Sequence, residues 1–403
     1  MVRPLNVFRW TAQALLSLLP GLLLGVQAQP VANSAPVTIG LDEAFSIATS
    51  TSPKAIERGI RAAMEEINAR GGVLGGRPLQ LVTTDNQGVS ARGRDNFIEL
   101  AARPDLAAVM GGKFSPITVE TLPEANRLQV PLFSVWGSAD PITEGAGGQV
   151  PPYGFRVSLK DSWGVEAMML RARSHQQATR LCALLPNTAW GRSSDRVMGT
   201  RAQALGVQMV SVRWYNWGDQ NFGEHLDHCR RGGGQSLILV ANEKEAAFVL
   251  THLAQMPAAQ RLPVIAHWGL TGGLLHELAP DALEKVDMQV IQTFTFVGND
   301  RPAARRLAAW IMRDGGFASA RAIPSPVGSA HAYDATHLLA LAINRAGAIR
   351  GPALKAALEN LPAFEGAVRR YAPAFTPQRH DALSPQEVLF VRVERSGELV
   401  PVR

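Results

Sequence analysis

The chain has 403 residues and a formal net charge of +6, with 46% hydrophobic and 18% charged residues. This length predicts two domains rather than one core, and the composition is typical of a globular protein. Lys and Arg are scattered, without a basic helix face or an aromatic platform between them, so the composition excludes nucleic-acid binding despite a sequence pI near 9.7.

The N-terminus has the pattern of an export signal. Arg3 and Arg9 precede an apolar run over residues 14–26, and residues 26–28 form a small-x-small cleavage pattern that ends at Ala28. This pattern predicts a signal peptide, 1–28, that is removed in the mature protein. The apolar run is short for a membrane span, no twin arginine precedes it, and no cysteine stands at the cleavage point. We therefore expect Sec-type export to the periplasm without a lipid anchor.

The stretch from Ser52 to Gly88 predicts a helix, a turn and a strand. Apolar residues recur at helical spacing from position 56 to 67. Ser52 is expected to cap this helix, and Pro53 suits its first turn. Gly71-Gly72 is expected to end it, and the strand follows at Leu79.

Strands and helices alternate along the rest of the chain, which predicts parallel sheets with helices on both faces. In the first half, the expected strands are Val37–Leu41, Leu79–Thr83, Leu106–Met110 and Pro131–Ser134, with helices that begin near Pro53, Ser90 and Pro116. In the second half, they are Leu181–Leu185, Val207–Trp214, Leu237–Val240 and Val264–Ala266, with helices at 194–205, 222–230 and 244–255. A β-prone run at 287–296, a helix at 332–346 and a hairpin of 388–393 with 399–402 complete the chain.

The chain has two cysteines. Cys182 lies in an expected buried strand, and Cys229 lies on a helical segment before Gly232-Gly233-Gly234. Export permits a disulfide between them, but disulfide geometry is demanding, so two buried thiols are the favoured reading. No His/Cys spacing predicts a metal site, and no motif predicts a cofactor.

Several segments carry a resemblance to a known family. They are AAMEEINARGGVLGGRPLQLVTTDNQG (62–88), VPLFS (130–134), YGFRVSLKDS (153–162), AWGRS (189–193) and SAHAYDATHLLALAINRAGA (329–348). In this order and spacing they resemble the leucine/isoleucine/valine-type periplasmic binding proteins, the type I solute receptors of ABC transporters. The resemblance covers nearly the whole mature chain.

The resemblance implies an α/β fold of two Rossmann-like lobes joined by a three-segment hinge. The first lobe would comprise 37–156 and 297–374, and the second 157–296 and 375–403. It also implies a monomeric receptor that binds a small ligand in the cleft and delivers it to an ABC permease in the inner membrane. A periplasmic sensing module for a membrane signalling partner is the alternative.

Ligands of open parallel sheets bind beyond the carboxyl ends of the strands, which points to the loops there. In the first lobe, Ser115 follows such a strand and precedes Pro116, so it is either a helix N-cap or, by resemblance, the group that binds a ligand carboxylate. Gly137 and Ser138 match a ligand-binding cluster of the family, although Trp136 makes this loop one residue longer.

In the second lobe, Trp190 stands where the family often has an aromatic lid. Asn242 and Glu243 follow one strand, and His267 and Trp268 follow the next. Amino-acid binders of the family have an acid in that last loop to pair with the ligand ammonium, and this chain has none there. Either Glu243 takes over this role, or the ligand is not an α-amino acid.

Aromatic residues near the strand ends predict a cleft with aromatic walls. The three tryptophans, with Phe114 and Phe45, suit a flat ring or a quaternary ammonium, although any one of these rings could instead pack the edge of a lobe. An aromatic or other carboxylate is therefore the favoured ligand class, and a branched-chain amino acid or amide comes second. No nucleophile elbow, phosphate loop or metalloprotease motif is present, which indicates that the protein is not an enzyme.

Overall fold

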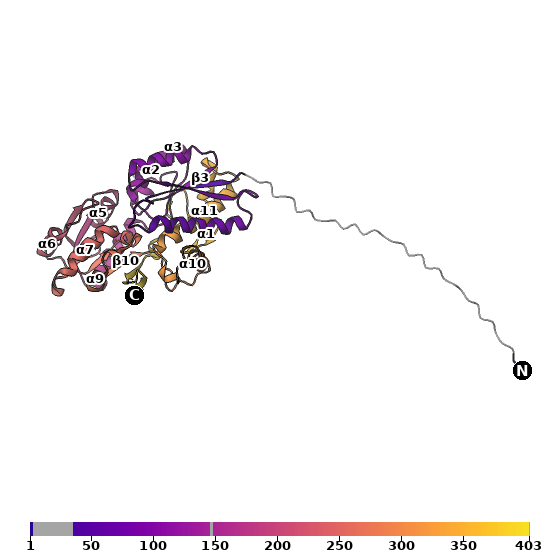
Figure 1. Cartoon of the computed structure of the whole chain (residues 1–403). Coiled ribbons are helices and arrows are strands. Elements are labelled where there is room, and N and C mark those ends of the chain that lie inside the picture. Colours follow the sequence, from indigo (N-terminus) through magenta and orange to yellow (C-terminus); the bar gives the residue numbers. More distant parts are fainter. Residues whose placement is uncertain (3–34, 146–147, 403) are drawn as a thin grey trace. The chain divides into compact units, whose positions relative to one another are not determined.

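The computed structural model describes residues 1–2, 35–145 and 148–402. The expected cleavage site after Ala28 lies outside the described residues. From Val37 onward strands and helices alternate, and the long strands form two separate sheets, each in its own lobe (Figure 1). Within the described part of the chain, no helix combines the length and the apolar character that crossing a membrane requires.

The first sheet has five parallel strands in the order β2-β1-β3-β4-β5. They are β1 (Val37–Glu43), β2 (Leu79–Asp85), β3 (Leu106–Gly111), β4 (Leu132–Ser134) and β5 (Gly154–Arg156). Alternate side chains of a strand point to opposite faces, and both faces of this sheet are covered. Val37 and Ile39 pack in the cluster that contains Ile56 and Ile60, whereas Leu106 packs with the helical residues on the other face.

The second sheet has seven strands in the order β14-β13-β10-β9-β8-β6-β7. They are β6 (Arg180–Pro186), β7 (Gln208–Tyr215), β8 (Ser236–Leu239), β9 (Val264–Ala266), β10 (Met288–Gln292), β13 (Leu389–Val393) and β14 (Leu399–Val402). The first five of these in chain order are parallel and repeat the strand order of the first sheet. The hairpin of β13 and β14 adds antiparallel strands at one edge, as expected.

The helices lie between these strands. They are α1 (Ser52–Ala69), α2 (Ser90–Ala101), α3 (Ser115–Leu128), α4 (Asp161–His175), α5 (Ala189–Arg201), α6 (Gly223–Arg231), α7 (Glu243–Gln255), α8 (Leu275–Leu278), α9 (Pro280–Lys285), α10 (Pro302–Gly315), α11 (Pro326–Ala346) and α12 (Gly351–Leu358). Two of them begin earlier than expected, α5 by five residues and α11 by six. A short hairpin, β11 (Phe364–Glu365) with β12 (Arg370–Tyr371), follows α12.

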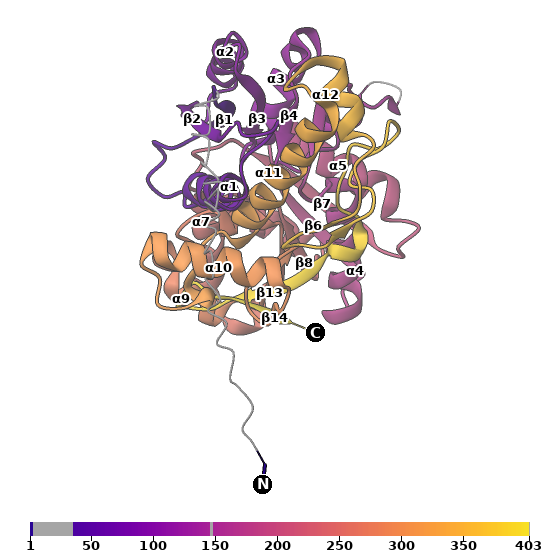
Figure 2. The same cartoon turned by 90° about the vertical axis from the view of Figure 1, so that its right-hand side faces the viewer.

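Helices α1 and α11 pack side by side against the first sheet (Figure 2). The apolar stripe of α1 is buried, as its spacing predicts, and Gly71 and Gly72 end the helix with positive φ angles. The expected cap is wrong, because Thr51 holds the N-cap position and the Ser52 hydroxyl contacts that of Ser50 instead.

The chain passes between the two lobes three times. It leaves the first sheet after β5 and enters α4, which packs on α5 and β9 of the second lobe. It returns between β10 and α10, which packs on α1, and crosses again between β12 and β13. The first and third crossings lie side by side, since Arg156 bridges to Asp381 of the third crossing through backbone hydrogen bonds.

The expectation of two free thiols is wrong, because Cys182 and Cys229 form a disulfide with a Cα–Cα distance of 5.8 Å. The glycine run that follows Cys229 explains how the bond fits. A Cβ on Gly234 would lie 2.3 Å from the Cys182 sulfur and 2.5 Å from the Cys229 sulfur, closer than atoms can approach. The disulfide links β6 to α6 within the core of the second lobe.

Candidate functional site

The strand order reverses between β1 and β3 in the first sheet and between β6 and β8 in the second. Ligands of such sheets bind at this switch point, outside the carboxyl ends of the strands. In this structure the two sets of loops meet. The Thr51 N–H donates to the Gly272 carbonyl at 2.9 Å, and the Leu274 N–H donates to the Thr49 carbonyl at 3.0 Å. The lobes are therefore closed on each other.

Ser115 is not the N-cap of α3, because Phe114 holds that position and no side chain caps the helix. The Ser115 hydroxyl oxygen instead accepts hydrogen bonds from the backbone N–H groups of Ser138 and Ala139, at 3.2 and 3.3 Å. Two N–H groups thus converge on one point at the edge of the first lobe. Such a pair, beside a hydroxyl and the start of a helix, suits an anionic or carbonyl oxygen.

Gly137 has a structural role in this loop. A Cβ at this position would lie 2.7 Å from the Gly112 carbonyl oxygen, so only glycine permits the close approach of the two loops. Its own carbonyl accepts hydrogen bonds from Ser134 and Ser158. Gly137 therefore positions Ser138, and its own carbonyl is occupied within the loop.

The expected tryptophans form the aromatic centre of the closed interface. Trp136 of the first lobe and Trp268 of the second lie with ring centroids 6.1 Å apart, and Trp190 meets the edge of His267 at 4.9 Å. All three indoles are buried. The Trp190 indole N–H and Nδ1 of His267 are also buried, and neither has a hydrogen-bond partner.

Asp161, the first residue of α4, is a buried acid at the site that was not predicted from the sequence. Its side chain is fully buried, and neither carboxylate oxygen has a hydrogen-bond partner. Its Oδ1 lies 3.3 Å from Nε2 of His267, which in turn lies 3.5 Å from the Ser138 hydroxyl. The backbone N–H of Asp161 donates to the Ser138 carbonyl at 2.8 Å. This places the carboxylate beside Ser138.

Asp161 could have been recognised from its position. It is an acid at the start of a helix, directly after the strand of the first crossing and within the YGFRVSLKDS segment. An acid that pairs with a ligand ammonium was expected only in the loops after β8 and β9. The two expected alternatives, pairing by Glu243 or a ligand that is not an α-amino acid, therefore left out Asp161.

Glu243 is already paired with a cation of the chain itself. Both of its carboxylate oxygens lie near Nζ of Lys113, at 3.2 and 3.1 Å, and Thr49 donates to one of them. Lys113, from the loop after β3, was not among the expected site residues. Asn242 is buried next to Glu243 at the N-cap position of α7, where its side chain makes no capping hydrogen bond.

The two phenylalanines lie apart from each other. Phe114 packs against Trp217 across the lobe interface with a centroid distance of 5.0 Å, and Trp217 was another residue missed in the sequence. Phe45 is half-buried in the loop after β1, with the Lys54 ammonium 5.5 Å from its ring centroid. Phe114 therefore closes one side of the interface, and we do not include Phe45 in the site.

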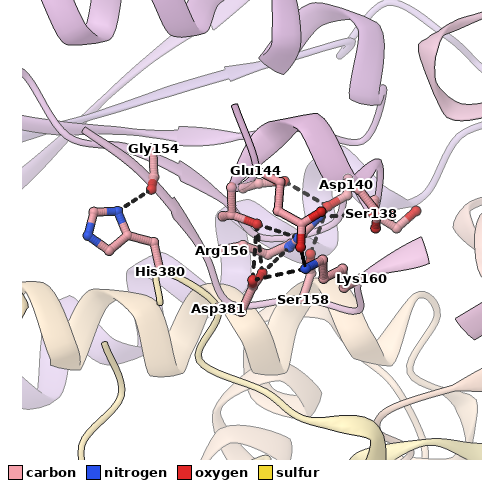
Figure 3. A network of polar contacts seen from close by, with 12 residues as sticks. Ser138, Asp140, Glu144, Gly154, Arg156, Ser158, Lys160, His380 and Asp381 are labelled. Atoms are coloured by element: carbon pink, nitrogen blue, oxygen red, sulfur yellow. Dashed lines mark hydrogen bonds and ion pairs between the residues drawn. The ribbon is translucent and has the colours of Figure 1, made fainter. Parts of the chain in front are cut away.

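A buried network beneath Ser138 holds these loops in place (Figure 3). The Arg156 guanidinium donates to the carbonyls of Ser138 and Ala139, both at 2.9 Å, and to Asp381 at 2.6 Å. Burial alone would raise the pKa of Asp381, but the charge and hydrogen bond of Arg156, with Lys160 and Thr143, together outweigh it and hold this pKa below its usual value. The Ser138 carbonyl shares a peptide unit with the Ala139 N–H, so Arg156 orients one of the two N–H groups that face Ser115.

Asp140 lies between this network and the second lobe. Its backbone N–H donates to the Ser193 hydroxyl, and its carboxylate accepts from the Ser162 N–H, both at 3.0 Å. Burial, with the nearby Asp161 charge, raises the pKa of Asp140 to about 6. Two acids thus lie close together at the lobe interface.

Comparison with known proteins identifies the family. The family model described as "Periplasmic binding protein" matches residues 36–398. A search of the curated proteins found no match.

Solved structures share the fold. A periplasmic binding protein type 1 from Bordetella pertussis is 19% identical with a TM-score of 0.81, over 91% of this chain and 100% of that one. The branched-chain amino acid transporter substrate-binding protein of Streptococcus pneumoniae, solved with isoleucine, is 20% identical with a TM-score of 0.75 over the same shares. A solute-binding protein from R. palustris, solved with benzoate, is 16% identical with a TM-score of 0.73, over 91% of this chain and 96% of that one. The chain belongs to the periplasmic binding protein family, a family of solute-binding proteins with the type I two-lobed fold and not of enzymes.

Proposed function

We propose that this protein captures a small solute with a carboxylate and a cationic nitrogen, such as an α-amino acid, and delivers it to an ABC permease. The observation that carries the ligand class is the Asp161 carboxylate, which is fully buried without a hydrogen-bond partner. A buried carboxylate whose oxygens accept no hydrogen bond is costly even beside His267, whereas a cation that donates to it removes much of that cost. A ligand ammonium next to Asp161 would supply that cation.

The two lobes offer opposite polarity to such a ligand. The first lobe presents the Ser115 hydroxyl, whose oxygen accepts the N–H groups of Ser138 and Ala139 and whose O–H can donate to a ligand carboxylate. The second lobe presents Asp161, which suits an ammonium. A solute that carries both groups binds each lobe by one end, so it stabilises the closed arrangement by differential contact.

The rings of Trp136, Trp190 and Trp268 would enclose the rest of the solute. These indoles favour an apolar or aromatic side chain, because large rings gain most from covering apolar surface. The unpartnered indole N–H of Trp190 adds a donor for a polar atom of the solute.

An aromatic carboxylate without a nitrogen is the second candidate, supported by the same tryptophans. It would bring a negative charge toward Asp161. Two like charges about 4 Å apart repel by roughly 4 kcal/mol at an effective dielectric constant of 20. We therefore rank it below an amino acid, which reverses the order expected from the sequence.

The lobes themselves are proposed with the boundaries expected from the sequence, 37–156 with 297–374 and 157–296 with 375–403. The strand membership of the two sheets supports this division, since β13 and β14 belong to the second sheet although they end the chain. Delivery to a permease is supported by the transporter proteins among the similar structures.

A melting-temperature screen of the purified protein against amino acids, amides, aromatic acids and betaines tests the proposal. A true ligand at about 100 times its dissociation constant stabilises the folded protein by roughly 2.7 kcal/mol. We expect α-amino acids with apolar or aromatic side chains to raise the melting temperature, and their deaminated acids to have little effect. A response to benzoate-type acids with none to amino acids would contradict the proposed ligand class.

A further inference from the structure

Lys113 and Glu243 form an ion pair between the lobes that is almost completely inaccessible to solvent. The side chains are 1% and 3% exposed, and the closest distance from Nζ to the carboxylate is 3.1 Å. Lys113 belongs to the loop after β3 in the first lobe, and Glu243 is the first residue of α7 in the second. Because water is excluded from this place, salt screens the pair far less than it screens a surface pair.

The ammonium of Lys113 is surrounded by acceptors. Besides the Glu243 carboxylate, Nζ donates to the Ser50 hydroxyl at 2.6 Å and approaches the Gly272 carbonyl oxygen at 3.4 Å. The Phe114 ring centroid lies 5.3 Å from Nζ, within the range of cation–π attraction. An ammonium has three N–H donors, and here each has an acceptor.

Close packing of Gly272 and Gly273 against the first lobe fixes the positions of these acceptors. A Cβ on Gly273 would lie 2.4 Å from Cγ of Glu243 and 2.3 Å from the Thr49 carbonyl, so only glycine lets the segment pass. A Cβ on Gly272 would touch both the Trp136 ring and Cε of Lys113. The ion pair therefore adjoins Trp136 and the site described above.

We infer that Glu243, Ser50 and the Gly272 carbonyl form an ammonium site between the lobes, which the chain fills with its own Lys113. Lys113 is then a specificity-determining residue. It occupies the Glu243 carboxylate, so the ammonium of a ligand pairs with Asp161. A second, distant ammonium on the same ligand would have no free carboxylate at this site. This last step rests on the proposed function, whereas the ammonium site itself does not.

Chemical rescue without any solute tests the ammonium site. Lys113→Ala removes three carbons and the ammonium, which n-propylammonium replaces atom for atom. We expect Lys113→Ala to lower the melting temperature by on the order of 5 °C, because it leaves Glu243 buried and unpaired. Propylammonium chloride should then raise the melting temperature of Lys113→Ala saturably, with no such rise for the wild type.

Two variants serve as controls for the rescue. Lys113→Ala/Glu243→Gln has the same cavity as Lys113→Ala but lacks the carboxylate that would pair with propylammonium. Lys244→Ala removes an exposed lysine from the same helix as Glu243. Neither should respond to propylammonium. An equal response of the double variant, or no response of Lys113→Ala, would overturn the inference.

If Lys113→Ala does not fold, Lys113→Met keeps the packing without the charge. The inference then requires Lys113→Met/Glu243→Gln to be more stable than Lys113→Met alone, since the second change removes an unpaired buried carboxylate. The opposite order would contradict it.

The specificity step has its own readout. L-Lysine should raise the melting temperature of Lys113→Ala more than that of the wild type, because its side-chain ammonium gains access to Glu243. A rescue by propylammonium without this gain would retain the ammonium site and refute its role in specificity. Failure of every amino acid in the wild type would instead count against the proposed function and leave the rescue result unaffected.

Discussion

The carboxylate of Asp161 lies 3.3 Å from Nε2 of His267, and both side chains are fully buried. Both residues belong to the second lobe, one at the start of α4 and the other directly after β9. This pair is therefore assembled within one lobe, and the Ser138 hydroxyl joins it from the other. The half of the site that we propose binds a cation therefore depends on the fold of a single lobe and not on closure.

Asp161→Asn should abolish the melting-temperature response to amino acids or weaken their binding by at least tenfold, since an amide offers no charge to an ammonium. A hydrogen-bonded ion pair is worth more than about 1.4 kcal/mol, which corresponds to a factor of ten. The folded protein should not be less stable than the wild type, because the change removes a buried charge whose oxygens accept no hydrogen bond. Isothermal titration and urea unfolding measure the two effects. Glu120→Gln, on the exposed side of α3, is the matched control.

Arg156→Met should destabilise the protein by about 3 kcal/mol, because it removes the closer cation of buried Asp381 and leaves only the ammonium of Lys160, 4.0 Å away. The second change Asp381→Asn should recover part of this loss. Urea unfolding of the three proteins gives the coupling energy between the two residues. If the double variant is no more stable than Arg156→Met, the charge of Asp381 is not the cause of the loss.

The disulfide should contribute about 4 kcal/mol to the free energy of unfolding, since it closes a loop of 47 residues in the unfolded chain. Cys182→Ala/Cys229→Ala removes the bond and keeps small apolar side chains in the core. Urea unfolding of this variant, compared with the wild type in the presence and absence of a reductant, measures the contribution. The variant itself should be insensitive to the reductant.

Glu43 makes the stability depend on pH. Burial is the main cause that raises its pKa to about 7, and the Lys113 N–H that donates to it opposes this effect. The folded protein therefore retains a proton that the unfolded chain loses near its ordinary value of 4.5. The resulting stability is present below that value and is lost as the pH rises to about 7.

Glu43→Gln should remove this dependence, because the neutral amide can still accept the Lys113 N–H. At pH 8 the variant should be more stable than the wild type by about 3 kcal/mol, and the difference should vanish near pH 4. Other buried acids, such as Asp140 and Asp334, contribute equally to both proteins, so the difference between the two unfolding curves isolates Glu43. A constant difference at all pH values would contradict the assignment.

The alternation of strands and helices predicted the strands of the two sheets except β5, because most buried parallel strands are short apolar runs bounded by turn residues. Strand β5 (Gly154–Arg156) has a single large apolar residue and was not predicted. Helix starts were less certain. Ser52 and Ser115 both precede proline at a helix start, yet neither hydroxyl caps its helix. Ser52 contacts the neighbouring Ser50 hydroxyl, whereas Ser115 is occupied by N–H groups of a loop that is distant in the sequence. A local pattern cannot show such tertiary competition.

Partnerships across the lobes were the part of the site that the sequence did not reveal. Trp136, Trp190 and Trp268 were predicted from their positions after strands, and the structure brings Trp136 and Trp268 together. Lys113 and Glu243 are 130 positions apart, so nothing local relates them. The disulfide was missed for a similar reason, although the Gly232-Gly233-Gly234 run beside Cys229 was a usable sign of close packing.

The complete burial of Asp161 and His267 has a consequence for the rates of binding. A solute cannot reach or leave groups with no exposed surface while the lobes are closed, so each event requires a prior opening of the hinge. Dissociation then requires the opening step, and a solute that stabilises the closed arrangement more strongly should slow that step. The affinities of related solutes would therefore differ mainly through their dissociation rates.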